Sequence, residues 1–137
     1  MTPSPADFAP ALAALEALEA RFAAKDWPAV VLAGKSAVWL FLQAALRRAG
    51  VEPSASGELA RDVAKAGARF PAFFAARVPR LVEFCEHLAV DAAAVEAAKA
   101  EGAAAPDPLL DWAVAERARL EALAVKELCL QLAEAQG

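Results

Sequence analysis

The stretch DWPAVVLAGKSAVWLFLQAALRRAG, residues 26–50, decides the fold. Asp26 before Trp27 and Pro28 is typical of a helix N-cap followed by proline in the first turn. Gly50 after two arginines is typical of a helix end, because glycine stops the helix and cations stabilise its negative end. The sequence therefore predicts one continuous helix over residues 27–49.

This helix is apolar on almost every side. Its polar strip is limited to four residues, which are Lys35, Ser36, Gln43 and Arg47. A helix with so wide an apolar surface lies at the centre of a bundle or shares that surface with a second subunit. We therefore assign Trp39, Leu42 and Leu46 to the core or to a dimer interface.

The composition of the whole chain favours helices around one core. The 137 residues are 59% hydrophobic, with alanine the commonest, seven phenylalanines, three tryptophans and no tyrosine. Alanine forms helices well and lets them approach closely, whereas the low content of β-branched residues argues against a sheet. We expect a single domain over residues 1–137, with an all-α fold that is an antiparallel bundle of four to five helices.

Prolines, glycines and apolar spacing mark the other helices. The first is expected from about Ser4, or after Pro10, to about Ala24. The others are expected over residues 58–65, over 71–76 as one or two turns, over 79–100, and over 107–135 after the cap signal of Asp107 and Pro108. The last helix is expected to bury a stripe made of Val114, Ala118, Val125, Leu128, Cys129 and Leu132.

Charge and cysteine usage limit the partners and the location. The net charge of −4 repels a polyanion, which argues against a general nucleic-acid-coating role. Cys85 and Cys129 lie inside helical patterns and are expected to be buried free thiols in a reducing cytoplasm. The N-terminus does not resemble a signal peptide, and Lys35 and Gln43 interrupt the longest apolar run, so no membrane span is expected.

The run from Lys25 to Pro53 resembles the second helix of HEPN domains, which are small prokaryotic helical bundles. The shared features are an acidic and aromatic start, small residues midway, and a leucine-rich end that stops at Gly-x-x-Pro. The resemblance extends over residues 10–135 through the order of helices and caps. It implies a homodimer, often encoded beside a minimal nucleotidyltransferase, that acts as an RNA-cutting toxin or as a non-catalytic binding subunit.

The polar signature of that family is eroded in this chain. Gly57-Glu58-Leu59 stands where members carry a His-Asp-Leu-like turn, and Ala104-Ala105-Pro106-Asp107 retains only the end of Arg-Tyr-Pro-Asp. Trp39 and Gln43 replace the midpoint Glu and Lys of many members. These departures favour the non-catalytic function.

Arg80 and His87 are the candidate catalytic residues. A separation of seven residues is about two helical turns, so both would share a face where a guanidinium holds phosphate and an imidazole moves a proton. The spacing resembles that of HEPN nucleases, although Leu81 stands where a polar residue is expected. An ordinary, partly exposed pair is the alternative. No metal is expected, because Glu83 and His87 lack a further pair of ligands, and no cofactor motif is present.

Residues 61–80 carry a local charge of +4, from five basic residues against Asp62. The candidate binding residues for a nucleotide, an RNA backbone or an acidic partner are Arg61, Lys65, Arg69 and Arg77. A solvated loop surface is the alternative. The neighbouring Phe70, Phe73 and Phe74 are expected in the core, and Trp27, Trp39 and Trp112 in the core or a dimer interface.

Three functional hypotheses follow. The first is a non-catalytic, dimeric HEPN-like protein that docks a partner, for which a nucleotidyltransferase is the first candidate. The second is a ribonuclease toxin that uses Arg80 and His87. The third is a helical small-molecule binder with a pocket near a tryptophan.

Overall fold

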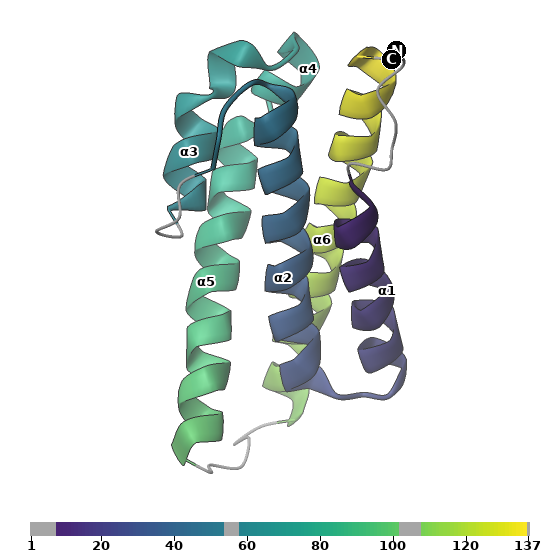
Figure 1. Cartoon of the computed structure of the whole chain (residues 1–137). Helices are drawn as coiled ribbons and strands as arrows, with labels where there is room; N and C mark the ends of the chain where they lie inside the picture. Colours follow the sequence, from purple (N-terminus) through teal and green to yellow (C-terminus); the bar gives the residue numbers. More distant parts are fainter. Residues whose placement is uncertain (1–7, 54–57, 102–107, 137) are drawn as a thin grey trace.

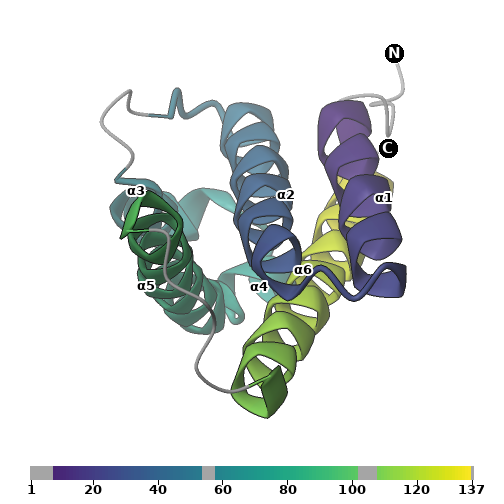
Figure 2. The same ribbon diagram turned by 90° about the horizontal axis from the view of Figure 1, so that it is seen from below.

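Helix α2 (Trp27–Arg48) lies at the centre of the computed structural model, which describes residues 8–53, 58–101 and 108–136. It packs against α1 (Ala9–Ala23), α5 (Val78–Glu101) and α6 (Pro108–Gln136), and its most extensive contact is with α6. Figure 2 shows α2 between α5 on one side and α1 and α6 on the other. The helix predicted over residues 27–49 is thus confirmed, and so is the all-α class.

The chain runs up and down along the four long helices (Figure 1). It descends in α1, ascends in α2, descends in α5 and ascends in α6. Between α2 and α5 it forms three short elements, α3 (Leu59–Lys65), which packs beside the upper part of α5, then η2 (Gly67–Arg69), and α4 (Ala72–Ala75) at the top of the molecule. Consecutive long helices are therefore antiparallel, whereas α2 and α6 run in the same direction.

Both ends of α2 carry the caps that the sequence predicts. The Asp26 carboxylate accepts a hydrogen bond from the backbone N–H of Ala29 at 3.4 Å. At the other end Gly50 has a positive φ of 80°. The N–H groups of Gly50 and Val51 donate to the carbonyls of Arg47 and Leu46 at 3.0 and 2.9 Å, which is a Schellman motif. Pro108 begins α6, as the sequence predicts, whereas the predicted cap Asp107 and the earliest predicted start of the first helix lie outside the described residues.

A glycine lets α6 approach α2 closely. Gly34 is buried in the middle of α2, and a Cβ at this position would lie 3.2 Å from the Cβ of Ala118 in α6. It would also lie 3.5 Å from Leu18 of α1. Small residues at this crossing therefore set the distance between the two helices.

The wide apolar surface of α2 is covered within one chain. Leu42 and Leu46 are 0% exposed, and Trp39 is half-buried with the ammonium of Lys35 5.3 Å from its ring. Of the two arrangements left open by the sequence, the central position in a bundle is the one observed. A second subunit is not needed to hide this helix, and the homodimer stays a prediction.

Among the described helices, α2 alone is long and apolar enough to cross a membrane by length and composition. More than half of its most apolar window, 56%, is buried inside the chain. The same composition is what the central helix of a bundle requires.

Replacing Leu42 by Asp would place an unpaired carboxylate in the core, at a position that is 0% exposed. We expect the free energy of unfolding to fall by on the order of 3–5 kcal/mol, measured by urea denaturation with circular dichroism. Ser36→Asp, at an exposed position of the same helix, should change it by less than about 0.5 kcal/mol. Equal stability of the two variants would contradict the central position of α2.

Candidate functional site

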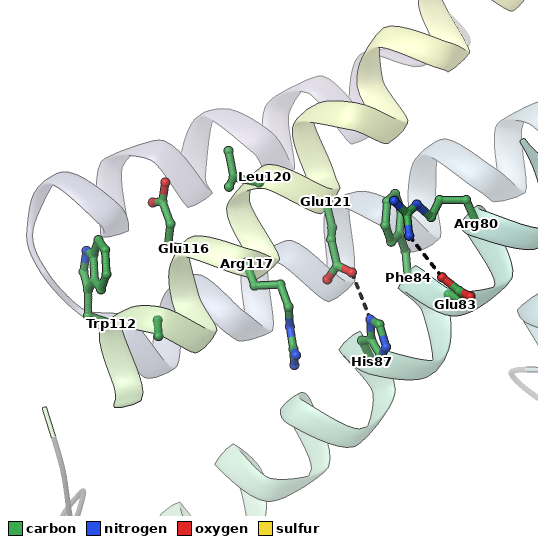
Figure 3. A pocket seen from close by; sticks show the side chains of 10 residues that line it. Arg80, Glu83, Phe84, His87, Trp112, Glu116, Arg117, Leu120 and Glu121 are labelled. Atoms are coloured by element: carbon green, nitrogen blue, oxygen red, sulfur yellow. Dashed lines mark hydrogen bonds and ion pairs between the residues drawn. The ribbon is translucent and has the colours of Figure 1, made fainter. Parts of the chain in front are cut away.

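Helices α5 and α6 both pack on α2 but touch each other little, and a groove of about 540 Å³ lies between them. Four residues of α5 and six of α6 line it (Figure 3). They are Arg80, Glu83, Phe84 and His87 on one wall, and Trp112, Ala113, Glu116, Arg117, Leu120 and Glu121 on the other. Charged and aromatic side chains from two helices thus converge on one concave surface.

Large apolar side chains are exposed in this groove. Trp112 is 45% exposed and Leu120 is 52% exposed, whereas Phe84 is partly buried against the core. Of the two placements expected for Trp112, the core of the chain is therefore wrong, since its side chain lines the groove, and the dimer interface stays a prediction. Phe73 was also expected in the core and is 37% exposed, whereas Phe70 and Phe74 are buried as predicted.

Glu121 is the buried acidic residue of the groove, with 6% of its surface exposed. Its Oε2 lies 3.1 Å from Nδ1 of His87 on the opposite wall (Figure 3). Its Oε1 is buried and has no hydrogen-bond partner. A buried carboxylate oxygen without a donor destabilises the fold, so this position is unusual for a helix whose other buried described residues are alanine, valine, cysteine and leucine.

Burial raises the pKa of Glu121 above its ordinary value of 4.5. The hydrogen bond and charge of His87 and the charge of Arg117 act in the opposite direction, and the charge of Asp91 adds to the increase. The carboxyl group therefore holds its proton more tightly in the folded protein than in the unfolded chain.

The two arginines of the groove already have carboxylate partners. Arg80 lies 3.4 Å from Glu83 and stacks over the ring of Phe84 at 5.9 Å. Arg117 forms an ion pair with Asp91 that joins α6 to α5. Neither guanidinium is left without a counter-charge, which reduces the attraction of this site for phosphate.

A further ion pair lies beside the groove wall. Glu116 lies 3.9 Å from Arg119. The Nε of Arg119 is 3.1 Å from both carboxylate oxygens of Glu19 in α1, and its guanidinium stacks on Phe22 at 4.9 Å. Arg119 thus ties α6 to α1.

The two candidate catalytic residues, Arg80 and His87, line the same groove from α5. The spacing argument therefore placed them on one face correctly, and their catalytic role stays a prediction. The sequence did not identify the wall opposite them on α6. One signal was present, because Glu121 falls in register with the buried positions Ala118 and Val125, where an acidic residue is out of place.

The four candidate binding residues of the 61–80 segment are spread over α3, η2 and the turn before α5. Arg61 is held by Glu58 at 2.9 Å, and Arg69 donates to the carbonyl of Gly50 at 3.4 Å. Lys65 and Arg77 are exposed. Two of the four candidate binding residues are therefore engaged by their own chain, and binding of RNA or a nucleotide here stays a prediction.

Both cysteines are buried free thiols, as the sequence predicts. Burial raises the pKa of Cys85 to about 12, with Glu121 and Glu86 adding to the increase. Burial also raises the pKa of Cys129, against a smaller opposing effect of Arg48. Within the described ranges, no group of three His, Cys, Asp or Glu side chains could hold a metal ion.

The two native thiols should react with a soluble aromatic disulfide reagent only as fast as the protein unfolds. The thiolate is the reactive form, and burial raises the pKa of both thiols, so little thiolate is present in the folded protein. Reaction kinetics before and after addition of denaturant measure this. A cysteine introduced at the exposed Ser36 should react at once and serves as the control. Rapid modification of two thiols in the folded protein would contradict the burial described above.

Glu121→Gln should raise the melting temperature at neutral pH. Because the folded-state pKa is raised, protonated Glu121 favours folding below about 4.5, and this contribution is lost as pH rises through the raised pKa. The stability advantage of the Gln variant should therefore grow between about pH 4 and pH 8 in thermal unfolding. Glu127→Gln, at an exposed position of α6, should show no such growth. A difference in melting temperature between Glu121→Gln and wild type that stays constant across this pH range would refute the raised pKa of Glu121.

Comparison of the chain with protein-family models, with curated proteins and with solved structures finds no match. The resemblance to HEPN domains therefore stays a prediction from the sequence.

Proposed function

We propose that this protein is a non-catalytic interaction protein that receives a helix of a partner in the groove between α5 and α6. The observation that carries the proposal is the exposure of Trp112 and Leu120, at 45% and 52%, within one concave surface. An amphipathic helix laid in such a groove would bury both side chains. Tryptophan is also the residue type most enriched among binding hot spots.

The charges around the groove favour a protein over RNA. Three carboxylates, Glu83, Glu116 and Glu121, line it beside two arginines, and both arginines, Glu83 and Glu116 are already paired. Such walls offer a phosphate backbone no excess of positive charge, whereas a protein surface can be complementary to walls of mixed sign.

The resemblance to HEPN domains suggests two occupants, a minimal nucleotidyltransferase and a second copy of this chain. The apolar surface of α2 no longer supports a dimer, because α1, α5 and α6 cover it. A dimer would therefore have to form through other surfaces, of which the α5/α6 groove is the first candidate.

A ribonuclease activity is the second candidate, because Glu121 holds Nδ1 of His87 at 3.1 Å in the groove that Arg80 also lines. The Nε2 of His87 would accept the proton of a ribose 2′-hydroxyl while that oxygen bonds to phosphorus and the bond to the 5′-oxygen breaks. The 5′-oxygen would then take the proton. Arg80 would balance the charge on the phosphate.

Incubation of the purified protein with single-stranded RNA separates the two candidates. We expect intact RNA, because Glu83 pairs with Arg80 and its carboxylate repels phosphate. RNA cleavage that is lost in both His87→Ala and Arg80→Ala would replace the first proposal by the second.

The docking proposal is tested with the double variant Trp112→Ser and Leu120→Ser. Proteins captured from the native host by wild type and by the variant are compared, and each candidate is then purified and titrated. We expect the variant to bind the true partner at least about 30-fold more weakly, the equivalent of about 2 kcal/mol. Sedimentation velocity on the same samples tests the second copy as the partner.

Val90→Ser is the matched control, because Val90 is 69% exposed on α5 and is not among the described residues that line the groove. It should leave binding unchanged. A partner that binds wild type and the double variant equally would show that the groove is not the docking surface.

A further inference from the structure

The outward face of α6 carries apolar and acidic side chains together. Trp112 and Leu120 are exposed on it, and Glu116 lies between them at intervals of four residues. Because an α-helix has about 3.6 residues per turn, each step of four residues rotates the direction by about 40°. The three side chains therefore point within an arc of about 80°. Figure 3 shows them on one side of α6, with Arg117 and Glu121 on the other.

This face stays acidic toward the C-terminal end of α6. Glu127 and Glu134 are exposed, and they follow Glu116 by 11 and 18 residues. These intervals are close to three and five whole turns, so the three glutamates point in nearly the same direction. The basic residues of the helix are turned by about 60° or more from that direction, and they are Arg117, Arg119 and Lys126.

The chain itself neutralises these glutamates poorly. Glu116 lies 3.9 Å from Arg119, but the Nε of that arginine already contacts both carboxylate oxygens of Glu19 at 3.1 Å. Within the ranges that the structure describes, the side chains of Glu127 and Glu134 form no ion pair or hydrogen bond. Exposed carboxylates of this kind are solvated in the free protein and can pair with cations that a partner brings.

We propose that the helix docked on Trp112 and Leu120 is basic and amphipathic, and that it presents two lysines or arginines to Glu116 and Glu127. The inference rests on the proposed docking function and names the chemistry of the partner. Complementary charges across an interface speed association and exclude partners of the wrong sign. The net charge of −4 also attracts a basic segment over a distance.

The spacing of these side chains favours a helix over a single cation. The 11 residues from Glu116 to Glu127 correspond to roughly 16 Å at about 1.5 Å per residue. A helix that packs alongside α6 has the same rise, so its two cations would also lie about eleven residues apart. Its apolar residues would cover Leu120 between the two acids and Trp112 beyond Glu116, whereas a free amine would leave both exposed.

The same spacing argues against a second copy of this chain as the source of that helix. Lysine and arginine occur more than once in α2, α3, α5 and α6. None of these helices, over its described residues, carries two of them ten or eleven positions apart. The occupant is therefore a different protein.

The first experiment uses a phage-displayed library of helical peptides with randomised surface positions, selected on the full chain. Peptides that bind the Trp112→Ser variant equally well are removed. We expect the remaining peptides to carry lysine or arginine at two positions about ten or eleven residues apart, with an apolar residue between them.

The second experiment titrates a selected peptide with charge variants of the protein. The double variant Glu116→Gln and Glu127→Gln should weaken binding by about fivefold or more at low ionic strength and reduce its dependence on salt. The matched control is the double variant Glu86→Gln and Glu96→Gln, which removes two exposed charges of α5 outside the groove. It should weaken binding by less than about twofold.

A charge reversal tests the direct pairing. Glu127→Lys should weaken binding further, and a peptide whose facing cation is replaced by glutamate should bind this variant at least about fivefold better than it binds wild type. Thermal unfolding of each variant shows that it is folded, so weaker binding cannot come from a damaged domain.

The outcomes separate this inference from the docking function. Peptides that need Trp112 but show no preference for paired cations would overturn the inference and leave the docking function standing. Equal losses in the two double variants, or no recovery on charge reversal, would overturn it as well. Self-association of the full chain that is lost in Trp112→Ser would replace the basic helix by a second copy. A selection without any peptide that depends on Trp112 would count against both proposals.

Discussion

The close crossing of α2 and α6 at Gly34 and Ala118 is the constraint on which the rest of the structure depends. Because neither residue has a bulky side chain, the two parallel helices approach until their small residues touch. α1 packs beside this pair, and α5 packs on another side of α2. The helix that follows α5 in sequence is therefore held mainly by α2, while the Arg117–Asp91 and His87–Glu121 pairs link it to α5. The open groove between α5 and α6 is a direct consequence.

The groove combines features that do not stabilise the isolated protein. Trp112 and Leu120 keep large apolar surfaces in water, and Glu121 keeps a carboxylate oxygen buried without a donor. Elsewhere the described core is built from apolar side chains and cysteines, with Glu121 as its buried charged residue. Local departures of this kind concentrate at functional sites, where a partner supplies the missing contact. The same groove therefore supports the docking function.

One wall of the candidate site could be predicted from the sequence. Arg80 and His87 lie two turns apart in a helix that has Pro79 in its first turn, and helical periodicity alone places them on one face. The facing residues of α6 could not be paired with them, because Glu121 is 34 positions from His87 in the sequence. The exposure of Trp112 was missed for a related reason. Its large apolar ring predicts burial, whereas its exposure depends on how the long helices pack against one another.

The sequence by itself determined where α2 begins and ends. Asp26 with Pro28, and Gly50 after two arginines, act within one or two turns of the chain, so their effect does not depend on the rest of the fold. The apolar periodicity of residues 27–49 likewise determined that this helix is mostly hidden. Only the tertiary structure decided what hides it, which helices touch, and where a groove stays open. Those outcomes depend on contacts between residues far apart in the chain, such as Gly34 with Ala118 and His87 with Glu121, and no local pattern encodes them.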